Sequence, residues 1–507
     1  MRESSGDHAS GVRALPETPP ASVAGGTKAM AASQALTQAT RLLSNVVLAR
    51  LLAPHDFGVV AIALVVTVFL DQLKDAGTGN ALIQAPRITH ALVNAVFWLN
   101  AAIGVVLSVV VFATAHPLAQ LLGNPEAAPV LRAFAAVTFM TSLAQVHHAL
   151  LRRDLRFRAV AIISAATAVT LAVGSIGLAF FGLGVWALVI GNLASTGVSV
   201  YLSWHYDRWR PTARTHWGEL RPIARYSTHL FLTNFLSFFY VQSDKVLVGR
   251  FLGAAPLGVY TLAQRILMYP LTAVSDVVNE IAFPVLAKNQ KDDEAVRTGF
   301  VRATCVTTLI TFPLMFGTAA VAEPAVHVIF GERWVDLIPL IQILAPIGAL
   351  QTIMFTSNGL LLAKGRSDLL FRLSLVNSAV VVAGYVIGLQ WGLVGMCVAY
   401  ATAILLLMAP SMFFAFRLVG LRHSQFGRAM LPQVGTSLVM FAATFAVVQA
   451  SRPLGSVLSL LAGAVTGVVV YGGLVALLRP PALEDALTVL RSRRQIASVP
   501  EDPAQAK

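Results

Sequence analysis

The residues of this sequence that are best suited to chemistry are charged side chains inside long apolar stretches. A charge at the centre of a bilayer costs roughly 2.5 to 3.5 kcal/mol on insertion scales, so each must face protein or water and have a partner. A cation held there can replace the water around an anion, and a carboxylate can carry a proton or another cation. The set therefore predicts a charged site within a membrane. Its members are Arg41, Asp71, Lys74, Asp75, Arg132, Asp244, Lys245, Arg265, Asp276 and Glu280.

These charges divide into two candidate roles. The substrate-binding candidates are the cations Arg41, Lys74, Lys245 and Arg265. The ion-coupling candidates are the carboxylates Asp71, Asp75, Asp244, Asp276 and Glu280. Asp276 and Glu280 lie four residues apart on one helical face, where mutual repulsion favours a bound proton on one of them. Solvation at a cavity mouth, or pairing with Lys288, is the alternative for these two.

Structural ion pairing is the alternative for other members of the set. Asp71 and Lys74 are spaced i, i+3, which places both on one face of a helix. Asp244 directly precedes Lys245, so the same explanation applies there. The sequence leaves open whether these charges bind a substrate or hold helices together.

The elements that must position these charges are membrane-spanning helices. The chain has 507 residues, of which 56% are hydrophobic and 12% charged, about half the ~25% charged share of soluble proteins. A spanning helix needs about 20 mostly apolar residues, and about fourteen stretches have that length. This composition excludes a water-soluble fold and predicts an all-α integral membrane protein with a central cavity. The predicted spans are 30–52, 57–83, 92–115, 128–150, 159–181, 184–204, 224–248, 256–284, 301–321, 338–362, 370–389, 392–415, 430–449 and 456–478.

The distribution of Lys and Arg predicts how the spans are oriented. About 28 of the 37 Lys and Arg residues fall in the termini and the even-numbered connections. About four fall on the opposite side, at Arg50, Arg250, Arg333 and Arg452. Because basic connections stay on the cytoplasmic side of a membrane, both termini are predicted to be cytoplasmic. Topology thus explains the net charge of +13, and nucleic-acid binding is not predicted.

An internal repeat divides the spans into two halves. Residues 50–59 match residues 250–259 at the Arg, one Leu, the Gly and the Val, at an offset of 200 residues. Six spans separate these points, so the halves have the same orientation and are related by an axis along the membrane normal. Parallel repeats predict a binding site between the halves, near the bilayer midplane. Further correspondences are Leu121–Gly123 with Ile329–Gly331, and Phe181–Gly184 with Trp391–Gly395.

The repeat and the span pattern define five regions. The two six-helix halves cover 28–223 and 224–428, and a terminal helix pair covers 429–480. The remaining segments, 1–27 and 481–507, are predicted cytoplasmic tails, the first of them disordered because it is polar and rich in Pro, Gly and Ser. Most of the intramembrane charge lies in spans one, two, seven and eight, which are equivalent pairs in the two halves.

Several motifs make the sequence resemble a known transporter family. The motifs act in combination, and the likeness runs over residues 27–478. The segments that carry it are Ala49–Gly58, Asp75–Gln84, Leu151–Phe157, Gly184–Leu188 and Asp244–Gly253. They resemble the polysaccharide transporter (Wzx-like) flippases of the multidrug/oligosaccharidyl-lipid/polysaccharide exporter superfamily.

This resemblance implies a fold and a function. Such proteins form a fourteen-helix bundle whose central cavity moves a lipid-linked oligosaccharide from the cytoplasmic to the outer leaflet, typically on undecaprenyl pyrophosphate. The resemblance implies alternating access in the bacterial inner membrane, for export of exopolysaccharide, capsule or O-antigen, without an enzymatic step or a cofactor. Its implied partners are the lipid-linked oligosaccharide, the bilayer, a polysaccharide polymerase and other assembly proteins. The four candidate cations would then bind the pyrophosphate.

Two other functions stay open on the sequence. A drug or cation exporter of the same superfamily would favour a net-acidic cavity, but the intramembrane charges balance. A membrane glycosyltransferase or ligase would need acid, base or phosphate-binding groups outside the membrane. The connection after the ninth span offers such groups, namely Glu323, His327, Glu332, Arg333 and Asp336.

Cysteine and histidine give no sign of metal or thiol chemistry. Cys305 and Cys397 both lie inside apolar runs, so neither a disulfide framework nor a thiolate metal site is predicted. His147 and His148 have no further ligand at metal-binding spacing on their helix, and both are expected at a polar helix face. We therefore predict neither a metal site nor catalytic residues.

Overall fold

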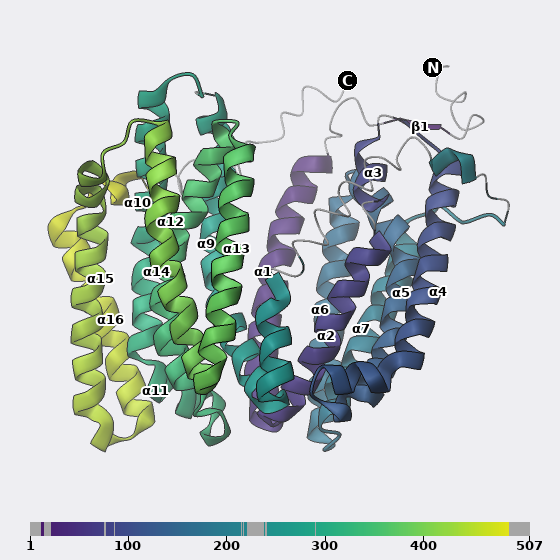
Figure 1. Ribbon diagram of the computed structural model, residues 1–507, viewed down its shortest axis with the longest axis horizontal. Helices are drawn as coiled ribbons and strands as arrows, with labels where there is room; N and C mark the ends of the chain where they lie inside the picture. The colour runs from purple at the N-terminus through teal and green to yellow at the C-terminus, as the bar shows by residue number, and fades with distance from the viewer. Residues whose placement is uncertain are drawn as a thin grey trace. The chain divides into compact units, whose positions relative to one another are not determined.

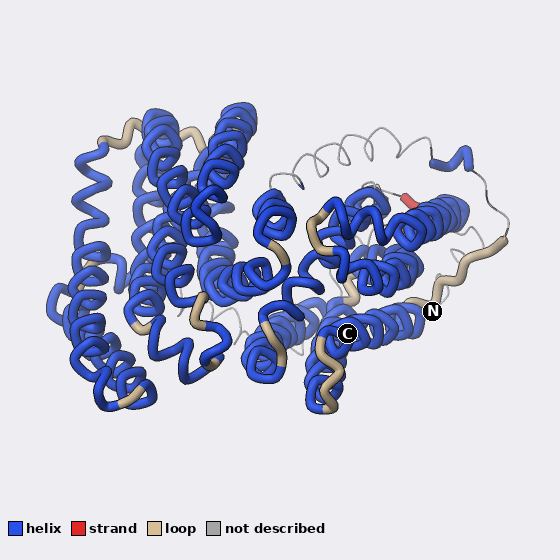
Figure 2. Tube along the Cα trace, turned by 60° about the horizontal axis from the view of Figure 1, so that its bottom comes forward, coloured by secondary structure: helices blue, strands red, loops and turns tan. Residues whose placement is uncertain are grey.

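The structure, a computed structural model, describes most of the apolar part of the chain. The described residues are 12–14, 22–75, 78–85, 87–213, 215, 217–220, 238, 241–288 and 290–485. Figure 2 shows how little of this described chain lies outside helices. The predicted all-α membrane class is confirmed.

The first of two compact units, Met1–Thr261, is a bundle of long helices. Within it, α6 packs along α1 and α7, and α5 packs along α4 and α7 (Figure 1). The pairs α4–α5 and α6–α7 are consecutive in the chain, whereas α1 packs against α6, which lies far from it in sequence. The helices are α1 (Ser22–Leu51), α2 (Pro54–Asp75), α3 (Thr78–Gln84), α4 (His90–Leu121), α5 (Ala128–Arg153), α6 (Phe157–Phe180) and α7 (Val185–Tyr206), then a helix over 241–252 and the start of α9 (Ala254–Lys288).

The second compact unit, Leu262–Lys507, is also helical. In it α10 packs against α12 and α15, α13 against α14, and α15 against α16. A Cβ added at Gly463 of α16 would lie 2.7 Å from Cγ2 of Val448 on α15, so this glycine lets the terminal pair approach closely. After the rest of α9 the helices are α10 (Asp293–Ala320), α11 (Ala322–Ala325), α12 (Leu337–Ala363), α13 (Ser367–Gly388), α14 (Gly392–Leu418), α15 (His423–Ser451) and α16 (Ser456–Leu478).

Ten helical stretches of the described chain are long and apolar enough to cross a membrane. One of them, Ser367–Leu418, comprises α13 and α14, which meet at Gly392 with a positive φ of 73°. The predicted seventh span, 224–248, falls largely outside the described residues. The chain is therefore a multi-pass membrane protein, and the count of fourteen spans stays a prediction.

The predicted second span, 57–83, corresponds to two helices. Helix α2 ends at Asp75 and α3 begins at Thr78. Residues 76 and 77 lie outside the described part. Helix α3 lines the candidate site.

Part of the predicted N-terminal tail has regular structure. Strand β1 (Val12–Ala14) pairs antiparallel with β2 (Arg87–Thr89), with Arg13 opposite Ile88. Helix α1 begins at Ser22, before the predicted domain boundary at residue 28. The backbone of the α3–α4 connection thus finds hydrogen-bond partners in the tail.

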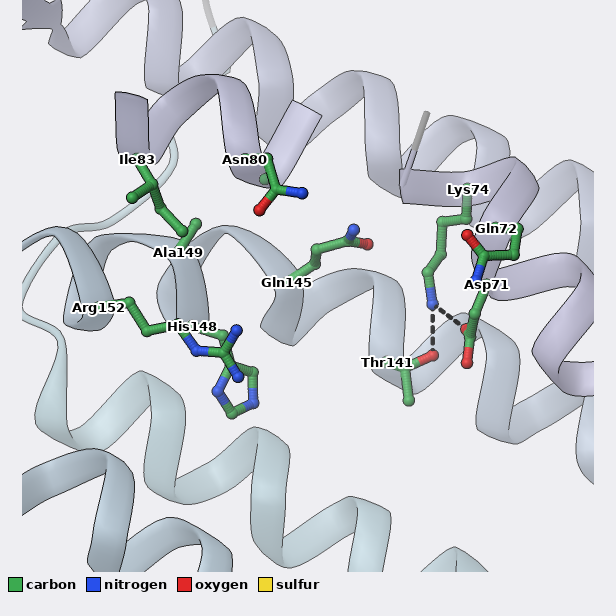
Figure 3. A pocket seen from close by; sticks show the side chains of 11 residues that line it. Asp71, Gln72, Lys74, Asn80, Ile83, Thr141, Gln145, His148, Ala149 and Arg152 are labelled. Atoms are coloured by element: carbon green, nitrogen blue, oxygen red, sulfur yellow. Dashed lines mark hydrogen bonds and ion pairs between the residues drawn. The ribbon is translucent and has the colours of Figure 1, made fainter. Parts of the chain in front are cut away.

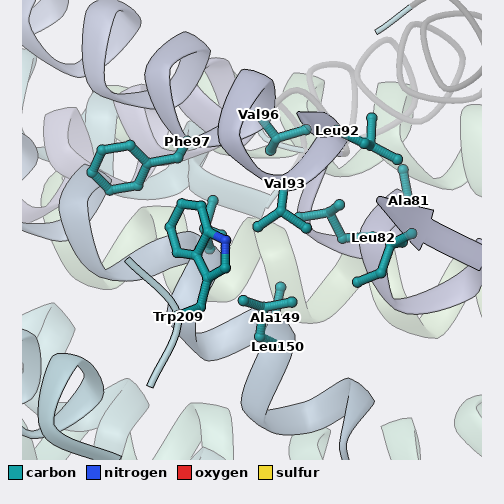
Figure 4. Close-up of a cluster of buried hydrophobic side chains, with 11 residues drawn as sticks. Ala81, Leu82, Leu92, Val93, Val96, Phe97, Ala149, Leu150 and Trp209 are labelled. Atoms are coloured by element: carbon teal, nitrogen blue, oxygen red, sulfur yellow. The ribbon is translucent and has the colours of Figure 1, made fainter. Parts of the chain in front are cut away.

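A cluster of buried side chains fixes α3 against its neighbours (Figure 4). Leu82 of α3 is fully buried beside Val93 and Val96 of α4. Trp209, from the segment after α7, belongs to the same cluster. Packing of this kind holds α3 in one position relative to α4 and α5. The cluster consists of Ala81, Leu82, Ile88, Leu92, Val93, Val96, Phe97, Val146, Ala149, Leu150 and Trp209.

Candidate functional site

A polar cavity lies within the first unit, between α2, α3 and α5 (Figure 3). Its volume is about 360 Å³, within the ~300–1,000 Å³ typical of ligand sites. Polar and charged side chains dominate its lining, and such groups inside a membrane protein mark functional sites. The lining residues are Asp71, Gln72, Lys74, Gly79, Asn80, Ile83, Thr141, Gln145, His148, Ala149 and Arg152.

Lys74, in the last turn of α2, occupies one end of the cavity. Its ammonium donates hydrogen bonds to Asp71 Oδ1 (2.6 Å) and to Thr141 Oγ1 on α5 (2.7 Å). The Lys74 side chain is 4% exposed, whereas that of Asp71 is 44% exposed. The helix C-terminus favours a cation, and the ion pair offsets the cost of burying it. The i, i+3 pair expected from the sequence is present, and both of its members line the cavity.

The middle and far end of the cavity also carry hydrogen-bonding groups. Asn80 of α3 and Gln145 of α5 lie between Lys74 and the far end (Figure 3). At that end Arg152 is exposed, and His148 precedes it by one helical turn on α5. The Nε2 atom of His148 lies 3.2 Å from the Ser203 hydroxyl of α7. A ligand in this cavity would therefore meet hydrogen-bonding groups along its whole length.

The fixed charges of the lining favour an anion. Lys74 and Arg152 are cationic, and Asp71 is the one carboxylate among the described lining residues. Because Lys74 is paired with Asp71, Arg152 supplies the excess positive charge. Ammonium and guanidinium groups bind phosphate oxygens through charge-assisted hydrogen bonds. The cavity is suited to a ligand that is both phosphorylated and polar.

Arg153 holds the cavity helix α3 in place without lining the cavity. Its side chain is 2% exposed, and a cation at the C-terminus of a helix satisfies carbonyls that lack partners. At the other end of α3, the Thr78 hydroxyl donates to Asn100 Oδ1 of α4 (3.2 Å). Sequence reasoning misses this role, because Arg152 and Arg153 look alike as members of a basic connection. Arg153 Nη1 donates to the carbonyl oxygens of Leu82 (2.7 Å), Ile83 (3.2 Å) and Ala85 (2.6 Å).

His147 is fully buried, so the prediction that it lies at a polar helix face is wrong. Its Nδ1 lies 2.8 Å from Oδ2 of Asp207, which directly follows α7 and is itself buried. The partner comes from another part of the chain, which helical spacing around His147 cannot reveal. His148, by contrast, lines the cavity. The rings that surround the His147 imidazole are Phe97, Trp204 and Trp209.

Three other candidates of the first unit whose side chains are described do not line this cavity. Arg41 is exposed on α1. Lys245 donates from Nζ to Gln242 Oε1 (2.6 Å). Asp244 is buried and accepts a hydrogen bond from the Tyr260 hydroxyl of α9 (2.9 Å). These contacts give Asp244 a role in joining two helices.

Four further candidates lie on helices whose bounds are described. Arg265 is half-buried on α9 and belongs to the second unit. Asp75 is the last residue of α2, and Asp276 and Glu280 lie in α9, but the side chains of these three fall outside the described part. The binding and coupling roles assigned from the sequence therefore stay predictions.

The polar groups of the connection after α10 contact one another and the terminal helix pair. Glu323 forms an ion pair with Arg452, which follows α15. His327 Nδ1 lies 2.8 Å from Glu332 Oε1. In each pair the acidic and basic groups are engaged with each other, whereas an acid–base catalyst would need them free to contact a substrate.

Comparison with known proteins identifies the family. A family model described as polysaccharide biosynthesis protein matches residues 47–339, more than half of the chain. The chain belongs to this family. The matched segment contains α2 through α10, and therefore every lining residue of the cavity.

Curated members of this group are similar over most of their length. The chain is 27% identical to the lipopolysaccharide biosynthesis protein WzxC of Escherichia coli K12, covering 71% of this chain and 74% of that protein. It is 29% identical to the succinoglycan biosynthesis transport protein ExoT of Rhizobium meliloti, covering 89% and 92%. A more distant relative, at 23%, is the probable low-salt glycan biosynthesis flippase Agl15 of Haloferax volcanii, covering 68% and 73%.

Solved structures show the same fold. The lipid II flippase MurJ in an inward closed conformation has a TM-score of 0.69 at 14% identity, covering 89% of this chain and 98% of that chain. An inward-facing multidrug resistance MATE family transporter of the MOP superfamily has a TM-score of 0.60 at 17% identity, covering 76% and 94%. The polysaccharide biosynthesis chain therefore has the fold of these transporters.

Proposed function

We propose that this chain is a flippase that moves a lipid-linked oligosaccharide across the bacterial inner membrane by alternating access. The carrier lipid in this proposal is undecaprenyl pyrophosphate, and the product serves polysaccharide export. Family membership supports the proposal, as do relatives named for lipopolysaccharide biosynthesis, succinoglycan transport and glycan flipping. The chain acts as a transporter and not as an enzyme.

The observation that carries the proposal is the polar cavity with a buried lysine at one end. A pyrophosphate is multiply anionic, so it needs cations to replace its water on entering a membrane protein. Lys74 and Arg152 supply them, and the amides of Asn80 and Gln145 match sugar hydroxyls as donors and acceptors. One cavity thus offers chemistry for both parts of the substrate headgroup.

The Asp71–Lys74 pair suggests how the site releases its ligand. Lys74 stays buried, while the Asp71 carboxylate is 44% exposed and can turn towards water. A phosphate oxygen then takes the place of the carboxylate beside Lys74, so the ammonium keeps a partner in both states. Exchange of one anion for another avoids an unpaired buried charge, which would cost several kcal/mol. The pair is therefore suited to repeated binding and release.

The charge of the lining also argues against the alternative of a cation or drug exporter. A cationic substrate requires carboxylates in excess of cations. The described lining has two cations and one carboxylate. The balance of charge across all intramembrane residues does not decide between these functions, but the lining of this cavity favours an anionic substrate.

The proposal includes an orientation and partners. Asp71 and Lys74 lie at the end of α2, and Arg152 lies at the end of α5, on the side that the distribution of Lys and Arg predicts to be cytoplasmic. This location suits loading from the cytoplasmic leaflet, with both termini inside and a polymerase and other assembly proteins as partners. Reporter fusions after Arg158 and after Lys364 are expected to be cytoplasmic, and opposite locations would contradict the proposed orientation.

Replacing Lys74 tests the proposed function. Lys74→Gln removes a charge-assisted hydrogen bond worth roughly 1.5 to 3 kcal/mol, so we expect about a tenfold to over a hundredfold loss of affinity. The assay measures flipping of undecaprenyl-pyrophosphate-linked glycan in proteoliposomes, normalised to folded protein. The matched control is Lys364→Gln, which removes an ion pair with Asp293 outside the cavity.

The outcomes separate substrate binding from helix stability. Reduced flipping with unchanged protein level and thermal stability supports a binding role for Lys74. A well-folded Lys74→Gln variant that flips the glycan with unchanged affinity contradicts the proposal. Equal losses in Lys74→Gln and Lys364→Gln would also contradict it, because Lys364 lies outside the cavity.

A further inference from the structure

The internal repeat of the sequence has an exact structural counterpart at two helix starts. Helix α1 ends at Leu51 and α2 begins at Pro54. In the second copy, the helix over 241–252 ends and α9 begins at Ala254. At the repeat offset of 200 residues, Pro54 is equivalent to Ala254, and Gly58 to Gly258. Both glycines therefore occupy the second turn of their helices.

These two copies contact each other reciprocally. A Cβ added at Gly58 would overlap the carbonyl oxygen of Ala254, and a Cβ at Gly258 would overlap the carbonyl oxygen of Pro54. Shifting each residue by the repeat offset turns one contact into the other. The crossing of α2 and α9 is thus an isologous contact with local two-fold symmetry. It requires glycine at both positions, because backbone touches backbone.

The crossing is closely packed and apolar. Val59 and Val259, which follow the two glycines, are each 3% exposed, and Leu257 is fully buried. A second contact supports the same end of the bundle, since Asn124 Nδ2 donates to the Gly249 carbonyl (2.8 Å). The glycine crossing is therefore surrounded by buried apolar side chains.

Helix α2 links this crossing to the candidate site. Gly58 and Lys74 are sixteen residues apart on α2, which corresponds to roughly 24 Å at 1.5 Å per residue. The charged cavity therefore lies at one end of α2 and the glycine crossing at the other.

We propose that the reciprocal Gly58/Gly258 crossing is the outer gate of the transporter. Contact between glycine backbones involves no interlocked side chains, so the helix starts can separate and meet again as one step. The inference rests on the proposed function and orientation, in which this end faces away from the cytoplasm. The gate gives a function to the repeated segments 50–59 and 250–259, which substrate binding does not explain.

Cysteine labelling tests the gate. The protein carries Cys305→Ser, Cys397→Ser and a reporter, Gln72→Cys, in the cavity lining. A membrane-impermeant maleimide is added from the outer side. We expect Gly58→Ala and Gly258→Ala to speed labelling severalfold and to similar extents, because the two contacts are equivalent. The control, Gly177→Ala on α6, should change nothing, since no atom lies within 4 Å of its added Cβ.

A variant that adds no volume tests the gate with less risk of misfolding. Asn124→Ala removes the hydrogen bond to Gly249 without adding volume, and it should speed labelling in the same direction to a smaller extent. Unchanged labelling in folded Gly58→Ala, Gly258→Ala and Asn124→Ala proteins overturns the gate. Labelling requires no glycan, so a response in these variants supports the gate even if Lys74→Gln flips glycan normally and the proposed substrate is wrong.

Discussion

The two ends of α2 are built on opposite principles. At the Lys74 end, hydrogen bonds and an ion pair surround a cavity of about 360 Å³. At the Gly58 end, backbone touches backbone, and the surrounding side chains are apolar and buried. The Lys74 ammonium can exchange its hydrogen-bond partners for atoms of a ligand, whereas the backbone contact at Gly58 is either formed or broken. We therefore call the Lys74 end of α2 its adjustable end and the Gly58 end its two-state end.

This comparison predicts which kinds of change each end tolerates. Charge and hydrogen-bond changes should act at the Lys74 end, mainly on affinity. Added volume should act at the Gly58 end, mainly on access. The predictions that follow compare the adjustable end with charges elsewhere in the chain, from the largest expected effect to the smallest.

Of the changes that follow, Arg153→Gln should have the largest effect. It leaves carbonyls at the end of α3 without their cationic partner, a loss of about 1 to 3 kcal/mol, and it releases the helix that carries Asn80. We expect the glycan KM to rise about fivefold to over a hundredfold. Arg153→Lys should restore part of the affinity because the charge survives. If the Lys variant restores stability but not KM, the positioning role is wrong.

Neutralising Asp75 or Asp276 should have the next largest effect. Both carboxylates are candidates for carrying the coupling ion, so Asn at either position should weaken the dependence of flipping on the proton or sodium gradient severalfold. Flipping is measured in proteoliposomes with and without an imposed gradient, and membrane insertion is followed in parallel. Full gradient dependence in both variants would remove these residues from the coupling role.

Arg152→Gln should have a smaller effect than Arg153→Gln. Arg152 lines the cavity but is exposed, so the hydrogen bond lost to a phosphate is worth about 1 kcal/mol, or roughly fivefold in affinity. Arg158→Gln is the matched control, since Arg158 is exposed nearby in sequence and does not line the cavity. Equal effects of the two variants would show that general surface charge, and not the cavity, governs binding.

Arg366→Gln should have the smallest effect. Arg366 pairs with Asp368 at the start of α13, where both side chains are about half exposed. Exposed pairs of this kind contribute little to stability. We expect unchanged glycan affinity and an unchanged melting temperature in detergent. A loss of flipping in this variant would extend the functional surface beyond the first unit.

The overall fold was predictable because its signals are long and repeated. Apolar stretches of membrane length predict the helices, and the match of residues 50–59 with 250–259 marks equivalent helix starts. What the match could not show is that the two copies touch. That contact depends on how α2 and α9 cross, which no spacing within one segment encodes.

The candidate site was only partly predictable. Asp71 and Lys74 stand out because charge within an apolar stretch is costly. Asn80, Gln145 and His148 carry no such signal, since uncharged polar residues near span ends are common. They come together because Arg153 and the cluster around Leu82 hold α3 beside α5.

During synthesis, the helices of the first unit reach the membrane before the segment that locks them. Asp207 pairs with His147, and the Thr212 amide donates to Asn94 Oδ1 (2.8 Å). A nascent chain that has emerged only as far as α7 lacks both partners, and a buried polar group without a partner costs about 1 to 3 kcal/mol. We therefore expect the packing of the first unit to be completed only after residues 207–212 have left the ribosome.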